Sequence, residues 1–509
     1  MQERIIVARQ NGRDRQHIVA GVVVMAVAAC IALFLLALNS DVSQSFPYFF
    51  LIPWITALAV VLLLPSGWLL YQGKFSFDNP IVFATFSYFF PAFVIGGFAL
   101  SAGLSQPYFL AYIQDARTNL PFTVQLIMLG FAGLSVGYFL PPGRLIGDFI
   151  KKYLSNVEYP DSSYLTPGLA LLAIGIVNSV LSLLFGLFGY QTAEEIGAFD
   201  GLLFLTTLFW LQASFLLWYV IFKKKAMDIN GWIIIGILIA TSLGKALFAG
   251  NRGSLIQIFT IIVLAYILAD RKFKLKQMIW SGILLFVAVV AGTIYGTTFR
   301  DIKGSESQVG AAEYTESIYS SIDKISRSDQ SSLLGSGIAT LAERIDTLSS
   351  VAVVVSNYEQ LAPFEESYGL EDNITKDLIT FLIPRFVWND KPVASEPRKY
   401  SELYFNYGEN SFAITPIGDL LRNFGVIGVL FGMMLLGIIL RAIYRSLIED
   451  QPRMVWRTTL YFMLLTAVSY EGFYGSIIPY IFKIGVTASV GIIFMHLFIR
   501  LKGGRRISA

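Results

Sequence analysis

Apolar residues occupy long, nearly unbroken stretches of this chain, and polar residues gather in the segments between them. A helix that crosses the hydrocarbon core of a bilayer needs about 20 apolar residues, and by this rule the pattern predicts about twelve membrane spans. Their centres fall near Val24, Leu58, Phe90, Leu129, Ile174, Phe209, Leu238, Ile261, Phe286, Val429, Leu464 and Gly491. A polar segment from Arg300 to Glu409 interrupts the series. The pattern therefore predicts an all-α polytopic membrane protein with one large loop.

The predicted organisation has three parts, namely residues 1–298 with the first nine spans, residues 299–412 as the large loop, and residues 413–509 with the last three spans. Within the loop, Gly304 to Gly337 is rich in Ser, Gly and acidic residues, which predicts a mobile segment. From Ile338 onward apolar residues recur at three- and four-residue intervals, which predicts an amphipathic helix. The loop is therefore expected to contain short helices.

Arginine and lysine residues mark every second loop. Arginines precede the first span, whereas intervening loops such as Ala193 to Asp200 are poor in Lys and Arg. Positive charge marks the cytoplasmic side of membrane proteins, so we expect both termini in the cytoplasm and the large loop on the outer face. The linker Pro141 to Tyr164, on the inner face, has apolar residues at nearly helical spacing. It is either an interfacial helix or an ordinary connecting loop.

Composition narrows the class of protein further. Hydrophobic residues make up 55% of the 509 residues and charged residues 14%, and the mean hydropathy is +0.63. Such a chain is too apolar for a soluble surface. The chain has one cysteine, which excludes an internal disulfide. It has only two histidines, which disfavours histidine-based catalysis and histidine-rich metal sites. The net charge is only +3, and we expect no nucleic-acid partner, cofactor or metal.

Cations at the predicted outer ends of spans and in the large loop are the candidate binding groups. A charge within or beside the bilayer is costly, so each marks a candidate site. They are Lys245, Arg252, Arg300, Arg344, Arg385, Lys391 and Arg422. Their concentration on the outer side opposes the usual cytoplasmic bias, and the planar fork of arginine matches phosphate oxygens. The set therefore favours an anionic ligand that carries phosphate.

The stretch Gly250-Asn251-Arg252-Gly253-Ser254 opens a predicted helix at the outer surface. Free backbone N–H groups at such a helix start bind anions well. Lys245 precedes Arg252 by seven residues, which places both on nearly the same helical face. The alternative is that Lys245 extends to the bilayer surface and Arg252 only caps a hairpin.

Arg385 has the most constrained local setting of these cations. It lies in FLIPRFVWNDKP, Phe381 to Pro392, where proline and aromatic residues hold its guanidinium on a stiff backbone that also carries Lys391. Arg300 is alternatively a plain charge at the membrane border, and Arg344 is equally suited to pair with an acidic neighbour.

Two carboxylates are the candidate proton acceptors. Asp419 precedes Arg422 by three residues, so the two can pair on one helical face, either as a structural ion pair or as catalytic groups. Glu471 lies among aromatic residues in Tyr470-Glu471-Gly472-Phe473, at the predicted outer end of a span. Burial there would make it a stronger base and suit it to general-base catalysis.

The sequence resembles the Wzy-type O-antigen and oligosaccharide repeat-unit polymerases of bacteria in four places. They are FLIPRFVWNDKP, PIGDLLRNFGVIGVLFGM (Pro416 to Met433), GNRGSL at Gly250 and the paired Glu343-Arg344. The resemblance is specific between Lys245 and Gly437 and only architectural elsewhere. It implies a GT-C-like membrane glycosyltransferase of the bacterial inner membrane. Such an enzyme transfers a growing glycan from undecaprenyl pyrophosphate to another lipid-linked repeat unit at the outer face.

This resemblance also implies partners and roles. The partners are undecaprenyl-pyrophosphate-linked oligosaccharides and membrane lipid, with a flippase and a chain-length regulator in the same system. The seven cations would bind the pyrophosphate, and Glu471 or Asp419 would accept the proton of the attacking hydroxyl. Related O-antigen ligases use a histidine of the outer loop, which this chain lacks, so a polymerase is favoured over a ligase. Two rival interpretations are a flippase for the same lipid and a non-catalytic assembly partner of a polysaccharide machine.

Overall fold

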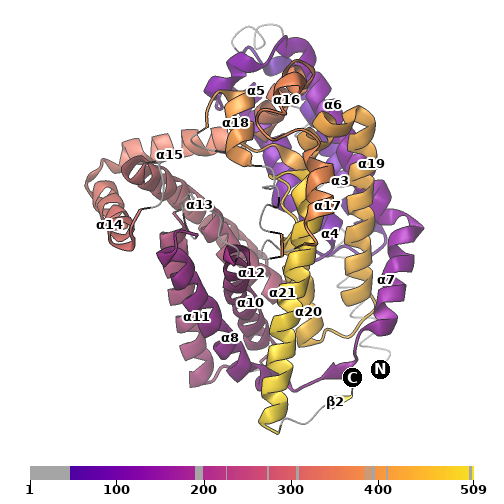
Figure 1. Ribbon diagram of the computed structural model, residues 1–509, viewed down its shortest axis with the longest axis vertical. Coiled ribbons are helices and arrows are strands. Elements are labelled where there is room, and N and C mark those ends of the chain that lie inside the picture. The colour runs from indigo at the N-terminus through magenta and orange to yellow at the C-terminus, as the bar shows by residue number, and fades with distance from the viewer. Residues whose placement is uncertain are drawn as a thin grey trace.

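Helices build almost the whole of the described chain (Figure 1). The computed structural model describes residues 46–508 apart from residues 188, 190–198, 225, 251, 272–273, 305–308, 384–386, 389–390, 392–395, 409–410 and 504–506. One pair of two-residue strands, β1 (Val157–Glu158) and β2 (Ile507–Ser508), runs antiparallel. This pairing joins the end of the chain to the linker that precedes α8.

The helices before the large loop are η1 (Phe49–Leu51), α3 (Ile52–Tyr71), α4 (Pro80–Ala84), η2 (Thr85–Ile95), α5 (Gly96–Ser101), η3 (Tyr108–Tyr112), α6 (Ala116–Phe139), α7 (Pro141–Tyr153), η4 (Asp161–Tyr164), α8 (Leu165–Leu184), α9 (Asp200–Thr207), α10 (Phe209–Lys223), α11 (Ile229–Ala249), α12 (Arg252–Leu268) and α13 (Leu275–Lys303). The loop contains α14 (Ala311–Arg327), α15 (Gln330–Ile345), α16 (Thr347–Leu361), η5 (Ala362–Phe364), α17 (Asn373–Thr380) and α18 (Pro397–Phe405). The chain continues through α19 (Thr415–Leu447), α20 (Val455–Thr466) and α21 (Tyr474–Leu501).

Nine helical segments in the described part of the chain are long and apolar enough to cross a membrane. They are Phe49–Tyr71, Pro80–Ser101, Ala116–Phe139, Asp161–Leu184, Asp200–Lys223, Ile229–Ala249, Ile279–Lys303, Thr415–Leu447 and Tyr474–Leu501. The predicted spans near Ile261 and Leu464 appear as the shorter helices α12 and α20, and the one near Val24 lies outside the described residues. The class of all-α polytopic membrane protein is thus confirmed, while the count of twelve stays a prediction.

The helices pack around two hydrophobic cores. The first core draws on α3 to α6, α16 to α18 and most of α19, and the second draws on α8, α10, α11, α12, α20 and α21. In Figure 1, α8 and α10 to α12 form one side of the molecule, α3, α6 and α19 form the other, and α21 runs between them. Helices α16 and α18 lie at the top of this view, which we call the upper end.

Glycines allow α6 and α19 to approach each other closely. A Cβ atom at Gly137 would collide with the carbonyl oxygen of Met434, and one at Gly437 would collide with that of Leu134. Small residues at such contacts let two helix backbones meet, which is how apolar helices gain packing energy within lipid. The α6–α19 pair is therefore a rigid wall against which the rest of the first core is built.

We expect Gly437→Val to destabilise the folded protein by about 1–3 kcal/mol, because the added side chain forces α6 and α19 apart. Gly282→Val is the matched control, since nothing lies within 4 Å of a Cβ built at Gly282 in α13. The thermal midpoint of the detergent-solubilised protein, followed by size-exclusion chromatography, measures both. Equal midpoints for the two variants would contradict the close contact.

Helix α19 is bent sharply at Gly425. This residue has φ 66° and ψ −167°, a conformation that suits glycine and not residues with a side chain. The short segment Thr415–Phe424 folds back beside the rest of the helix, so that Leu420 contacts Gly432 and Phe424 contacts Gly428. The bend therefore returns the polar residues of the short segment to the first core.

The large loop is more helical than its polar composition indicates. Helices α14 and α15 occupy much of the stretch from Gly304 to Gly337 that we expected to be mobile. The physical reason is that Tyr314 and Ile318 of α14 pack against Phe299 at the end of α13. This contact between distant residues is invisible in the polar composition of the stretch.

The single amphipathic helix predicted after Ile338 is also wrong, because the chain breaks there into α15 and α16. Asp346 separates the two helices and caps α16, and its carboxylate accepts a hydrogen bond from the Ser349 backbone N–H at 3.0 Å. Residues Thr347–Val355 of α16 are buried on every side. Burial raises the pKa of Asp346 to about 6, although Ser105 and Ser349 donate hydrogen bonds to it.

The linker after α6 is helical, as the first of its two interpretations proposed. Gly143 and Gly147 of α7 pack against Arg441 and Arg445 of α19, while apolar side chains on the other face, such as Phe149, are exposed. The contact of this face with a membrane stays a prediction.

Candidate functional site

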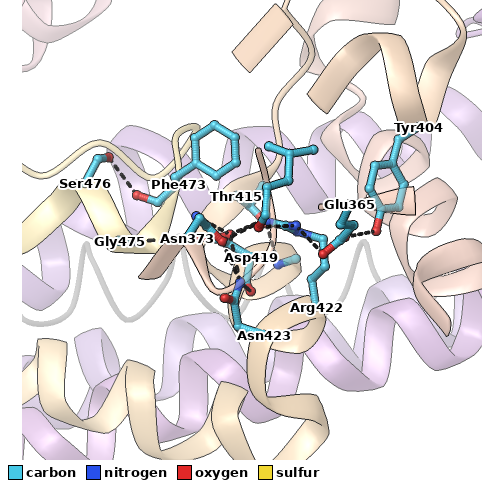
Figure 2. Close-up of polar contacts among 12 residues, drawn as sticks. Glu365, Asn373, Tyr404, Thr415, Asp419, Arg422, Asn423, Phe473, Gly475 and Ser476 are labelled. Carbon is cyan, nitrogen blue, oxygen red and sulfur yellow. Dashed lines mark hydrogen bonds and ion pairs between the residues drawn. The ribbon is translucent and has the colours of Figure 1, made fainter. Parts of the chain in front are cut away.

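Five elements of the chain meet in a buried polar cluster. They are the turn after η5, α17, α18, the short segment of α19 and the start of α21 (Figure 2). The residues that bond here are Glu365, Asn373, Tyr404, Asp419, Arg422, Asn423 and Gly475, which we call the polar cluster. The bend at Gly425 matters for this cluster, because it turns Asp419 and Arg422 toward α17.

Arg422 is at the centre of the polar cluster. Its Nη1 lies 2.7 Å from a carboxylate oxygen of Glu365, and its Nη2 lies 3.0 Å from Oδ1 of Asp419. Nη2 also donates a hydrogen bond of 2.7 Å to the side chain of Asn373. The side chain is only 1% exposed. A buried guanidinium needs such partners, since an unpaired charge in an apolar interior is strongly unfavourable.

Asp419 is fully buried, and several donors hold its carboxylate. Besides Arg422, the side-chain amide of Asn373 donates to Oδ1 at 3.1 Å, and the backbone N–H of Gly475 donates to Oδ2 at 3.3 Å. Gly475 lies in the first turn of α21, where an anion is favoured by the unpaired N–H groups and the helix dipole. The ion pair that the sequence predicted between Asp419 and Arg422 therefore forms, and the bond from Gly475 to Asp419 ties α19 to α21.

Glu365 closes the cluster on the side of the large loop. Its second carboxylate oxygen accepts a hydrogen bond of 2.7 Å from the Tyr404 hydroxyl. Burial, together with the charge of Glu365, raises the pKa of Tyr404, so this hydroxyl stays protonated and keeps donating. Two carboxylates thus share one guanidinium in this cluster, and the loop residues are locked onto α19.

An apolar groove borders the polar cluster. It has a volume of about 440 Å³ and is lined by residues of α17, of both parts of α19 and of α21. Ile374 of α17, Leu420 and Phe431 of α19, and Tyr474 of α21 are among them. The Tyr474 hydroxyl donates to the carbonyl of Gly432, another lining residue, at 2.7 Å, and the lining is almost wholly apolar. Such a lining suits an apolar ligand.

Glu471 lies just before α21, close to the start of the short segment of α19. Its backbone carbonyl accepts a hydrogen bond of 3.4 Å from the Thr415 N–H. The residue is exposed, so the burial expected from its aromatic neighbours is not found. The reason is that Tyr470 turns inward to pack on Tyr88 and Phe89, while the next residue points outward. Glu471 is therefore open to a ligand, whereas Asp419 is not.

The described cations among the seven candidates do not gather around one site. Lys245 of α11 lies 4.0 Å from the ring centroid of Trp210, and Arg344 is exposed on α15. Arg300 is half-buried near the end of α13, and Lys391 donates a hydrogen bond of 2.9 Å to the Ile383 carbonyl. Arg422 is held in the polar cluster. The elements α11, α15 and α19 that carry three of these cations are well separated in Figure 1.

Two of the seven cations fall outside what the structure describes. Arg385 is not among the described residues, and Arg252 is described only as the first residue of α12, without its side chain. Their predicted role in binding pyrophosphate stays a prediction, as does that of the other five. Among the described residues, no three His, Cys, Asp or Glu side chains gather closely enough to hold a metal ion.

Sequence reasoning missed Glu365, Asn373 and Tyr404. No local signal identifies them, because each acts through a partner that is distant in the chain, as the separation of 39 between Tyr404 and Glu365 illustrates. Lys376, exposed on α17 one residue after the groove-lining Thr375, was also missed.

Comparison with known proteins gives one match. The family described as Domain of unknown function (DUF8712) matches residues 162–448. No curated protein and no solved structure matches the chain. The matched range begins at η4, just before α8, and ends just after α19, and it contains Glu365, Asn373, Asp419 and Arg422 but not Glu471.

Proposed function

We propose that this chain, which belongs to the DUF8712 family, is a membrane glycosyltransferase that joins undecaprenyl-pyrophosphate-linked oligosaccharide units into O-antigen or a related surface polysaccharide. The reaction would take place at the outer face of the bacterial inner membrane, where the upper end of the molecule would lie. Both chain termini would then be cytoplasmic. A flippase would supply the lipid-linked units, and a chain-length regulator would act on the product.

The observation that supports this proposal most is the contact between α17, which precedes one stretch that resembles the polymerases, and the short segment of α19, which carries the start of the other. Helix α17 leads directly into Phe381 to Pro392, and the short segment of α19 carries Pro416 to Phe424. Helix α17 and the short segment of α19 share the polar cluster through Asn373, and both line the apolar groove. A substrate with a hydrocarbon tail and a polar headgroup needs an apolar surface and polar groups side by side.

The proposed reaction breaks the bond between the sugar C1 and the pyrophosphate oxygen and forms a new bond from C1 to a hydroxyl of the acceptor sugar. The pyrophosphate leaves with the bonding electron pair, and a carboxylate accepts the hydroxyl proton. Cations fixed where negative charge grows stabilise the transition state more than the ground state. We assign this role first to Arg252 and Arg385, and the role of proton acceptor first to Glu471 because it is exposed.

A flippase for the same lipid is the second candidate function. The observation that favours it is the bend of α19 at Gly425, because interrupted helices often form the substrate sites of transporters. The two functions differ in where substrate accumulates when the protein is lost. A flippase mutant collects lipid-linked units on the inner leaflet, and a polymerase mutant collects them on the outer leaflet.

We expect Arg385→Ala and Arg252→Ala each to reduce polymerisation by about 100-fold or more, because a preset cation is lost from the leaving group. Long polysaccharide should disappear from cells, while single repeat units persist. Arg327→Ala is the control, since Arg327 is exposed on α14 and pairs only with Asp323 of the same helix among the described residues. Normal chain lengths in both test variants would contradict the proposed roles.

The direct test uses the purified full-length protein and a defined undecaprenyl-pyrophosphate oligosaccharide. A ladder of products, each longer by one repeat unit, is the expected result. Movement of the lipid-linked oligosaccharide across vesicle membranes, without any change in its length, would instead identify the flippase.

A further inference from the structure

We infer that the apolar groove between α17 and α19 binds the polyprenyl chain of the lipid-linked donor. This inference rests on the proposed function and specifies where its substrate is held. The groove would fix the lipid tail, so that the attached pyrophosphate lies near α17.

The groove is built by the bend of α19. Because the short segment folds back, Leu420 and Phe424 lie beside Gly428 and Gly432 and form one wall together with Phe431. Helix α17 forms the opposite wall. A straight α19 would leave no such wall, so the cavity follows from the backbone conformation of Gly425.

The groove is continuous with exposed apolar side chains on both of its walls. Phe431 is 56% exposed and Leu435 46% exposed on α19, and Ile379 is 69% exposed on α17. All three also line the groove. Exposed apolar patches mark surfaces that contact lipid or protein, and through this one a hydrocarbon chain would enter the groove sideways without crossing water.

Helix α17 brings polar groups to the same place. Thr375 lines the groove, the exposed Lys376 follows it, and Asn373 at the start of the helix belongs to the polar cluster. An ammonium group on the helix that lines the groove complements a lipid phosphate. The helix also leads into Phe381, whose ring packs 5.5 Å from that of Phe482 on α21. Helix α17, which lines the groove, thus ends directly before Phe381.

These features favour the tail of the proposed donor over an ordinary phospholipid. A bulk phospholipid needs no defined contact with the loop, whereas the donor must present its pyrophosphate to the same loop at every transfer. A groove shared by α17 and α19 satisfies that requirement, because α19 is fixed to α17 through the polar cluster.

The test is photolabelling of the full-length protein in phosphatidylcholine vesicles with undecaprenyl phosphate that carries a diazirine on its chain. We expect the label on peptides of α17 and α19. Filling the groove by Leu435→Trp should reduce labelling of these peptides about tenfold. The control is Leu497→Trp on α21, because Leu497 is similarly exposed, at 52%, and does not line the groove. Thr375→Trp fills the groove from the other wall and serves if the first variant does not fold.

Competition identifies the ligand. Excess unlabelled undecaprenyl phosphate should abolish the label, and excess phosphatidic acid should not. Equal competition by phosphatidic acid, or label spread evenly over the lipid-facing helices, would overturn the inference. The photolabelling assay measures binding alone. If the groove peptides are labelled but the protein makes no polymer, only the proposed function is contradicted. If both tryptophan variants in the groove polymerise at the normal rate, only the inference about the groove is contradicted.

Discussion

Arg422→Ala should destabilise the folded protein by about 3–5 kcal/mol, because it leaves the carboxylates of Glu365 and Asp419 buried without their shared cation. The Arg422 side chain is 1% exposed, that of Glu365 8% and that of Asp419 0%, so water cannot replace the missing partner. Part of the loss also comes from the hydrogen bonds of Arg422 to Asn373 and to the Leu370 carbonyl. Urea or thermal unfolding of the solubilised protein measures the change.

Two further variants separate this loss from a general effect of removing arginine. Arg327→Ala breaks an exposed pair on α14 and should change stability by about 0.5 kcal/mol or less. Glu365→Gln leaves one carboxylate for one guanidinium and should be milder than Arg422→Ala. If Arg422→Ala unfolds at the same temperature as Arg327→Ala, the polar cluster does not hold the loop to α19.

The sequence alone predicts only part of the polar cluster. The pair of Asp419 and Arg422 follows from their spacing of three on a helix, and the structure contains it. The contacts of Arg422 with Asn373 and Leu370 span 49 and 52 residues. No periodicity in one sequence links residues so far apart, and α17 itself is only eight residues long. The sequence therefore predicts the pair but not the loop that closes over it.

The bend of α19 was equally hidden. A long apolar run follows Gly425, and such a run predicts a span whether or not the backbone before it turns back. Glycine permits the turn but also occurs in straight spans, as Gly437 shows in the same helix. What decides the bend is the packing of Leu420 and Phe424 on Gly432 and Gly428, which depends on the folded backbone.

Nine of the predicted spans are long helices in the described part of the chain, because each needs only enough apolar residues to satisfy one rule. The candidate site depends on tertiary contacts instead. The seven cations were grouped by their predicted side of the membrane, yet a shared side does not bring side chains together, and those described lie on separate elements. The exposure of Glu471 escaped prediction for a similar reason, since its aromatic neighbours indicate burial of the segment but not the direction of each side chain.

Glu471→Gln should lower the rate of polymerisation by about 10² to 10⁴-fold, the range typical of losing a general base. The amide keeps the shape of the side chain but cannot take the proton of the attacking sugar hydroxyl. Because that proton moves only in the transition state, the loss should fall on kcat with little change in KM. The thermal midpoint should stay that of the unaltered protein, since Glu471 is exposed and no ion pair joins it to another residue in the described part of the chain.

Asp419→Asn is the matched comparison, because it makes the same chemical change in the other candidate carboxylate. Asp419 is buried and bonded to Arg422, Asn373 and Gly475, so the variant should lose stability first, and activity only as the folded fraction falls. Glu471→Asp should recover part of the rate, since it restores a carboxylate that is set back by one methylene. A normal kcat in Glu471→Gln, together with a large loss of kcat in a fully folded Asp419→Asn, would reverse the assignment and place the proton acceptor inside the polar cluster.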